Sequence, residues 1–156
     1  MAKQAKQLDD LFVDVLKDIY YAEKKILTTL PKMAKAARSP DLKAAFEKHA
    51  RETEGQVSRL EKVFSLLEQT PKGKKCEAIE GLVKEGQDGI KEFKGSPALD
   101  AALLATAQAV EHHEISRYGT LIAWANWLDI PQAVKRGKEC RRIVGRRNCG
   151  ATCRDW

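Results

Sequence analysis

Apolar side chains recur at intervals of three, four or seven residues over three long stretches of the chain, which is the spacing of an amphipathic helix. The first stretch is expected to be helical to about Ala37. Its apolar stripe consists of Leu8, Phe12, Val15, Ile19, Ile26, Leu30 and Met33. A second helix is predicted to follow directly, because Ser39 suits an N-cap, Pro40 suits the first helical position and the helix dipole favours Asp41.

The second stripe contains polar residues among the apolar ones, and Thr70-Pro71-Lys72-Gly73 is predicted to end it. It consists of Leu42, Phe46, His49, Thr53, Gln56, Leu60, Val63 and Leu67. A shorter, glycine-containing helix is expected from about Glu77 to Phe93. Ser96-Pro97 repeats the cap signature and predicts the start of the third long helix. The stripe of that helix is Leu99, Leu103, Ala107, Val110, Glu114, Tyr118, Leu121, Ala125 and Leu128.

A fourth bundle helix is expected from about Ile130, with a thin apolar face made of Ile130, Val134, Cys140 and Val144. The first two long helices are joined by a short turn and must form an antiparallel hairpin, whereas a long connection precedes the third. This order predicts an all-α, ferritin-like four-helix bundle with a short connecting helix. We expect the bundle to occupy residues 1–144. The basic segment 145–156 has no apolar period and is expected to be loosely ordered.

The net charge of +6 is confined to the end of the chain. Residues 1–130 hold 20 basic and 20 acidic residues, whereas residues 131–156 hold eight basic residues against Glu139 and Asp155. A neutral body argues against nucleic acid as a partner, because a phosphate-binding face should be basic. A nucleic-acid arm formed by the Arg-rich terminus alone is the remaining alternative.

No run of apolar residues is long enough to span a bilayer, and residues 1–7 have no signal-peptide character. We therefore expect a cytoplasmic protein without a membrane partner. The four cysteines, Cys76, Cys140, Cys149 and Cys153, have spacings that match no zinc-finger or CxxC pattern. In that compartment we interpret them as free thiols.

Polar residues interrupt the apolar stripes near the middle of each long helix. Glu23 lies 16 residues before Ser39, and the segment 52–56 lies 13 to 17 residues after it, so the two groups should be level in an antiparallel hairpin. Glu111 and Glu114 straddle the midpoint of the third long helix. The polar residues expected in this layer are Glu23, His49, Glu52, Gln56, Glu111, Glu114 and Tyr118.

Buried carboxylates must be protonated, paired or bound to a metal, because an isolated buried charge costs several kcal/mol. Divalent first-row metals favour carboxylate and imidazole ligands, and facing helices that present Glu are typical of di-iron and di-manganese bundles. The alternative is a structural ion-paired network, for which Arg51 and Arg117 are available. His49 taken alone is compatible with a satisfied core histidine, and Tyr118 with simple packing.

Four segments in order resemble the ferritin-like stress-response family typified by YciE and YciF. They are LDDLFVDVLKDIYYAEKKI, FEKHARETEGQVSRLEKVF, KKCEAIEGLVKEG and AQAVEHHEISRYGTLIAWA, and the resemblance covers about residues 8–134. It implies a ferritin-like fold, a homodimer and a rubrerythrin-like di-metal site. The end of the chain departs from the pattern, because KRGKECRRIVGRRNCGATCRDW replaces the acidic stretch of the family's last helix, as a replaced or frameshifted terminus would.

The leading hypothesis is a stress-response bundle with a di-metal carboxylate site for iron or manganese, without an assigned reaction. The predicted metal ligands, with Gln56 and Tyr118 supporting them, are Glu23, His49, Glu52, Glu111 and Glu114. The resemblance points to all of these residues except Glu111, which the layer alone adds. Glu139, the only acidic residue of the last helix, should lie roughly 8–12 Å from the layer along a straight helix. The alternative hypothesis is a non-catalytic dimeric scaffold whose polar layer is structural.

Overall fold

Five helices and no strand make up the part of the chain that the computed structural model describes, which is residues 6–150, with side chains to residue 146. The helices are α1 (Leu8–Ala36), α2 (Pro40–Leu66), α3 (Glu77–Glu92), α4 (Leu99–Trp127) and α5 (Pro131–Gly150). Within this range no helix has the length and apolar character that a bilayer crossing needs.

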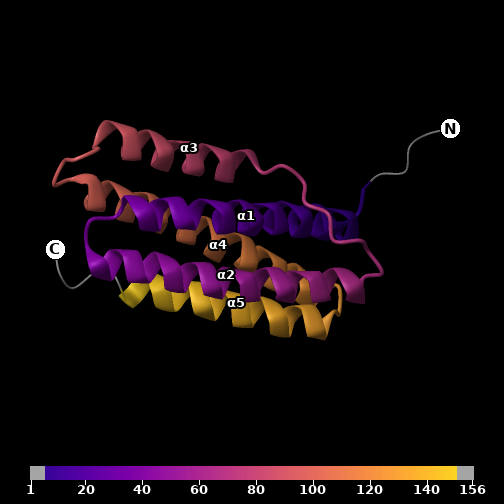
Figure 1. Ribbon diagram of the computed structural model, residues 1–156. Coiled ribbons are helices and arrows are strands. Elements are labelled where there is room, and N and C mark those ends of the chain that lie inside the picture. The colour runs from indigo at the N-terminus through magenta and orange to yellow at the C-terminus, as the bar shows by residue number, and fades with distance from the viewer. Residues whose placement is uncertain (1–5, 151–156) are drawn as a thin grey trace.

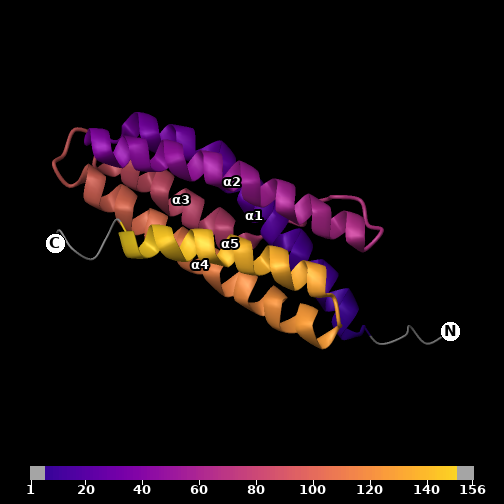
Figure 2. The same cartoon turned by 90° about the horizontal axis from the view of Figure 1, so that it is seen from below.

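Helices α1, α2, α4 and α5 run along one long axis and form a four-membered bundle (Figures 1 and 2). The α1–α2 hairpin packs against the α4–α5 hairpin, because α1 contacts α4 and α2 contacts α5. The shorter α3 lies outside this set and packs across α1 and α4. The arrangement confirms the predicted ferritin-like four-helix bundle with a connecting helix.

The turn between α1 and α2 is held by the caps that the sequence predicts and by one contact that it does not. The Ser39 hydroxyl accepts a hydrogen bond from the Leu42 amide at 3.4 Å, so Ser39 is the N-cap of α2. The Asp100 carboxylate, in the first turn of α4, accepts hydrogen bonds from the amides of Arg38 and Ser39, each at 2.8 Å. Asp100 thereby joins the start of α4 to the first hairpin.

The start of α4 differs from the prediction. Ser96-Pro97 was expected to open the helix, but α4 begins at Leu99 and its N-cap is Ala98. The Ser96 hydroxyl instead accepts the amide of Ala98, which closes a turn just before the helix. The Ser-Pro signature is therefore used for a turn here, as side chains of this type commonly are.

Helices α2 and α4 end in the same way. Glu68 and Asp129 each adopt φ of 53°, and the next amide in each case bonds back to a carbonyl five residues earlier. These are Schellman motifs, which glycine usually terminates. The first of them stops α2 at Leu66, before the predicted Thr70-Pro71 break.

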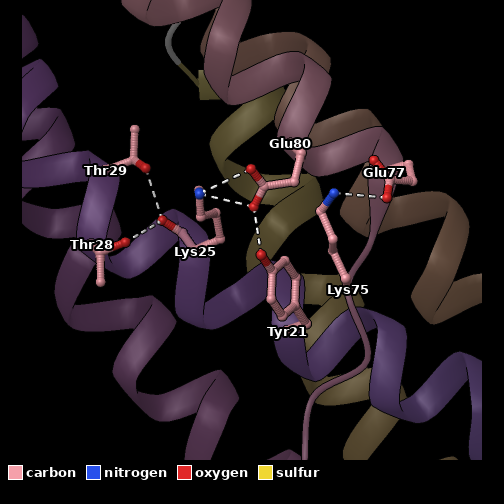
Figure 3. Close-up of polar contacts among 7 residues, drawn as sticks. All are labelled: Tyr21, Lys25, Thr28, Thr29, Lys75, Glu77 and Glu80. Carbon is pink, nitrogen blue, oxygen red and sulfur yellow. Dashed lines mark hydrogen bonds and ion pairs between the residues drawn. The ribbon is translucent and has the colours of Figure 1, made fainter.

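The connecting helix α3 lies close against α4 and is fastened to α1 by polar contacts. A Cβ atom on Gly86 would lie 2.8 Å from the Thr106 methyl group, so the glycine permits the close approach. On the other side, the Tyr21 hydroxyl donates to Glu80 at 2.5 Å and the Lys25 ammonium lies 2.8 Å from the same carboxylate (Figure 3). Burial of an apolar face and these contacts together position α3.

Helix α5 continues beyond Val144, where the apolar period ends, as far as Gly150. Val144 has no exposed surface, and nothing lies within 4 Å of the place where a Cβ atom on Gly145 would be. The backbone of residues 145–150 is thus helical where the sequence analysis expected loose order. Residues 151–156, the rest of the predicted basic segment, lie outside the described residues.

Candidate metal centre

Two carboxylates without any exposed surface form the centre of the polar layer. Glu23 on α1 and Glu114 on α4 are both fully buried. The Tyr118 hydroxyl donates to Glu23 Oε1 at 2.6 Å, and the Gln56 amide donates to Glu114 Oε1 at 3.4 Å. His49 Nε2 lies 3.8 Å from Glu114 Oε2. The structure therefore brings these five predicted residues of α1, α2 and α4 into the interior of the bundle.

The remaining predicted ligands, Glu52 and Glu111, occupy a different place. They line a cavity of about 260 Å³ together with His49, Lys48 and Arg146. Glu52 is partly exposed and lies 4.0 Å from Lys48, whereas Glu111 is buried. His49 thus stands between this cavity and the buried carboxylates. The five predicted ligands are divided between the buried pair and the cavity beside it.

Among the described residues, two buried side-chain oxygen atoms in the layer are unsatisfied hydrogen-bond acceptors. Neither Thr53 Oγ1 nor Gln56 Oε1 has a hydrogen-bond partner within the described part of the chain, although both side chains are fully buried. A buried acceptor without a partner is costly, so such atoms need an explanation such as a bound ion or an ordered water. Carboxylate, imidazole and amide oxygen donors fit a divalent first-row metal.

Helix α5 supplies a thiol to this layer. Cys140 is buried beside Tyr118 and Glu23, and burial, with the nearby Glu23 carboxylate, raises the pKa of its thiol to about 12. Burial and Glu23 likewise raise the pKa of Tyr118 well above its usual value. Sequence analysis placed Cys140 on the apolar face but did not give it a role. At neutral pH both groups are protonated and uncharged.

Glu139, the acidic residue of α5, faces away from the layer. Its carboxylate lies 3.4 Å from Arg59 Nε on α2, and its side chain is 37% exposed. The adjacent Cys140 lies beside Tyr118 and Glu23, so the direction of the Glu139 side chain, and not the expected offset along the helix, keeps it out of the layer. Arg59 is thereby engaged at the surface between α2 and α5.

An apolar cavity of about 290 Å³ leads toward the layer from the α3 side. Its walls come mainly from α1, α3 and α4, with Ile26, Val83 and Val110 among them, and the buried His49 of α2 also lines it. Lys32 and Lys91 lie at its exposed rim. The connecting helix therefore contributes one wall of a cavity that the His49 imidazole also lines.

A second group of potential ligands was missed by the sequence analysis. Asp18, Cys76 and His113 place one ligand atom each within 4.8 Å of one another, and no other such group of three His, Cys, Asp or Glu residues is found among the described residues. Arg117 Nε lies 3.1 Å from Asp18. Burial and the Arg117 charge lower the pKa of His113. No stripe pattern could have revealed this group, because its three members come from segments far apart in the sequence.

Known proteins resemble this chain along most of its length. The family described as "Domain of unknown function (DUF892)" matches residues 7–142. The chain belongs to the DUF892 family. Its match extends eight residues further into α5 than the 8–134 range expected from sequence.

One relative of this DUF892 protein is Protein YciF of Escherichia coli K12, which is 40% identical over 135 residues, covering 86% of this chain and 81% of YciF. Two solved structures are similar. A protein described as YcfI, a putative structural protein from Rhodopseudomonas palustris, has a TM-score of 0.94 and 40% identity over 100% of this chain and 99% of its own. The E. coli stress protein YciF has a TM-score of 0.88 and 37% identity over 93% and 92% of the two chains. The chain is thus a homologue of a stress protein, as the four quoted segments predicted.

Proposed function

We propose that this DUF892 protein is a stress-response bundle that binds iron or manganese in its buried layer, with His49 and Glu114 as ligands of one ion and Glu23 as a further buried carboxylate of the layer. The observation that carries the proposal is the pair of fully buried carboxylates beside an imidazole. The partnerless oxygen of Gln56 in the same layer supports it. A divalent cation would compensate two buried negative charges that are costly without one.

A di-metal centre, as the sequence predicts, would draw its second set of ligands from Glu52 and Glu111. Both line the cavity next to His49, which gives a second ion access from solvent. Helix α5 adds no carboxylate, since Glu139 pairs with Arg59. The second position therefore has fewer acidic donors than the carboxylate-rich centres typical of this class of bundle.

The chain's own residues orient the buried donors. Tyr118 holds Glu23 through its hydroxyl, and Gln56 holds Glu114 through its amide, so each carboxylate is oriented by an uncharged hydrogen-bond donor. Neighbours of this kind fix the orientation of metal ligands and tune their basicity. A bound iron or manganese ion would supply Lewis acidity or redox chemistry at this position.

The test is elemental analysis of protein purified without chelator and then loaded with Fe²⁺ or Mn²⁺. We expect at least one equivalent per chain in the wild type and at least a tenfold weaker affinity in Glu114→Gln, which keeps the side-chain volume but removes the charge. Glu139→Gln is the matched control, because it removes a carboxylate that already pairs with Arg59.

The stoichiometry separates the two versions of the proposal. Two equivalents, reduced to one by Glu111→Gln, would extend the site to a di-metal centre. One equivalent would restrict it to the His49–Glu114 pair of the buried layer. Wild-type protein that takes up neither metal would refute the proposal.

A dimeric scaffold is the second candidate, favoured by apolar side chains at one end of the bundle. Trp127, the last residue of α4, is 80% exposed, and Leu11 and Leu66 are also exposed near the ends of α1 and α2. These helix ends lie at the same end of the molecule (Figures 1 and 2). The similar R. palustris protein is described as a putative structural protein.

The scaffold candidate and the predicted cytoplasmic homodimer share one test. Light scattering after size-exclusion chromatography should give a dimer mass for the wild type and a monomer mass for Trp127→Glu if this end is the interface. A metal-free protein that dimerises through Trp127 would favour the scaffold. A monomeric wild type would exclude the homodimer.

A further inference from the structure

We propose that Asp18, Cys76 and His113 form a zinc site that is separate from the buried layer and shares no ligand with it. The three residues belong to three different elements: α1, the N-cap of α3, and α4. Their ligand atoms lie within 4.8 Å of one another. Carboxylate, thiolate and imidazole are the ligand types that zinc accepts together, whereas iron and manganese sites rich in carboxylate use fewer thiolates.

The one distance that is resolved within the group fits zinc coordination. Cys76 Sγ and His113 Nε2 are 3.7 Å apart. With Zn–S of about 2.3 Å and Zn–N of about 2.05 Å, a tetrahedral ion separates a sulfur and a nitrogen ligand by roughly 3.6 Å. The pair is therefore spaced for one ion without moving either helix.

Local structure favours a thiolate at Cys76 once a cation is present. Cys76 is the N-cap of α3. Burial raises the pKa of its thiol, whereas the nearby backbone amides of Ile79 and Ala78 act in the opposite direction. Amides and the positive end of a helix stabilise negative charge at this position. The Cys76 sulfur lies within hydrogen-bonding distance of His113 Nε2, with Asp18 nearby, and a zinc ion would replace the thiol proton, which leaves to solvent.

The surroundings favour zinc over a nucleophilic Cys-His-Asp arrangement. Cys76 is only 2% exposed and could not reach a substrate outside the fold. Asp18 and His113 are half-buried, so a small ion can enter between them and a water can complete the fourth position. Asp18 also lies 3.1 Å from Arg117 Nε, and this cation would compete with the metal for the carboxylate.

The experiment uses the full-length chain with Cys149→Ser and Cys153→Ser, which removes the thiols near the C-terminus. Zinc affinity is measured by competition with a chromophoric chelator, and Co²⁺ is used as a probe because thiolate–cobalt charge transfer absorbs in the near ultraviolet. We expect a zinc equivalent that depends on Cys76 and a thiolate band in this background, besides any zinc that the buried layer takes up. Cys76→Ser should abolish the band, and both Cys76→Ser and His113→Gln should weaken zinc binding at least tenfold.

Matched controls exist on the same helices or for the same residue type. Cys140→Ser removes the other buried thiol, and His112→Gln removes the exposed neighbour of His113, so neither should change affinity by more than about threefold. Arg117→Gln should tighten zinc binding, because it removes the cation beside Asp18. Glu114→Gln should leave the thiolate band intact, which separates this site from the buried layer.

Three outcomes would overturn the proposal. The Cys149→Ser, Cys153→Ser protein could fail to bind zinc, His113→Gln could bind zinc as tightly as that protein does, or the control variants could lose as much affinity as the ligand variants. His113→Gln keeps the test decisive if Cys76→Ser does not fold, because His113 is only half-buried.

Discussion

Glu114 shows at the scale of one residue why the layer needs a counter-charge. Its carboxylate is fully buried, and His49 Nε2 lies 3.8 Å from its Oε2. Arg117, which the sequence offered as an ion-pair partner, lies against Asp18 instead. Negative charges on Glu114 and Glu23 together would raise the free energy of the metal-free fold.

The first prediction concerns the metal-free stability of Glu114→Gln. Without metal the variant should unfold at the same denaturant concentration as the wild type or a higher one, because the isosteric change relieves repulsion between buried carboxylates. Chemical denaturation of both proteins in chelator measures this. If Glu114 belongs to a structural ion-paired network, the same change leaves a buried cation without its partner and costs about 3–5 kcal/mol.

Cys140 gives the layer an alkaline pH dependence. Its thiol pKa rises from the ordinary value of 9.0 to about 12 in the folded state. A raised pKa means that the folded state retains a proton that the unfolded chain releases. The stabilisation from this group is therefore complete below pH 9.0 and is lost as the pH rises to about 12.

The second prediction compares the wild type with Cys140→Ser across this range. The difference in unfolding free energy should be constant below pH 9.0 and then shift against the wild type, by at most about 1.4 kcal/mol per pH unit. Subtracting the variant removes the parallel effect of Tyr118. A constant difference from pH 8 to 11 would show that the thiol titrates normally.

Individual site residues were predictable where they share a helix phase. Glu23, His49, Gln56, Glu114 and Tyr118 lie on apolar stripes, and all five are buried as expected. Their role as a metal site stays a prediction. The Asp18, Cys76 and His113 group could not be found in this way, because it depends on where the loop before α3 crosses α1. That crossing is set by contacts such as the Lys74 amide with the Lys17 carbonyl at 3.1 Å.

At the scale of elements, helix interiors were easier to predict than helix ends. The periods located all five helices, and Ser39 was identified correctly as a cap. The ends of α2 and α4 instead use Glu68 and Asp129 at φ of 53°. Neither residue is glycine, so the usual sequence signal for a Schellman motif is missing.

The third prediction follows from that backbone conformation. Asp129→Gly should stabilise the protein by about 0.5–1 kcal/mol, because glycine adopts positive φ without the steric penalty of a side chain. Thermal or chemical unfolding measures the gain. Asp129→Ala is the matched control and should not stabilise, since alanine lacks both the freedom of glycine and the local hydrogen bonding of aspartate. A loss in Asp129→Gly would show that the carboxylate contributes more than the strain costs.

At the scale of the whole molecule, topology followed from connection lengths. A short turn after α1 enforced one hairpin, and the long segment containing α3 brought α4 back beside α1. Connection lengths could not predict which side of the bundle α3 covers. The Tyr21–Lys25–Glu80 contacts (Figure 3) and the close approach of Gly86 to Thr106 decide it. They place α3 against a cavity that His49 also lines.

The last prediction asks where the bundle ends. Val144 is the last described residue with a fully buried side chain, so removing residues 145–156 should change stability by no more than about 1 kcal/mol, as surface changes do. Removing residues 140–156 also deletes Cys140 and Val144 from the core and opens Tyr118 and Glu23 to water. Burial of one Val side chain alone is worth about 1.5–3 kcal/mol, so the longer truncation should cost at least 3 kcal/mol. Denaturant melts of the two truncations beside the full chain measure both effects. If the shorter truncation costs as much as the longer one, residues beyond Val144 are part of the bundle, and the helical backbone to Gly150 is anchored by packing against it.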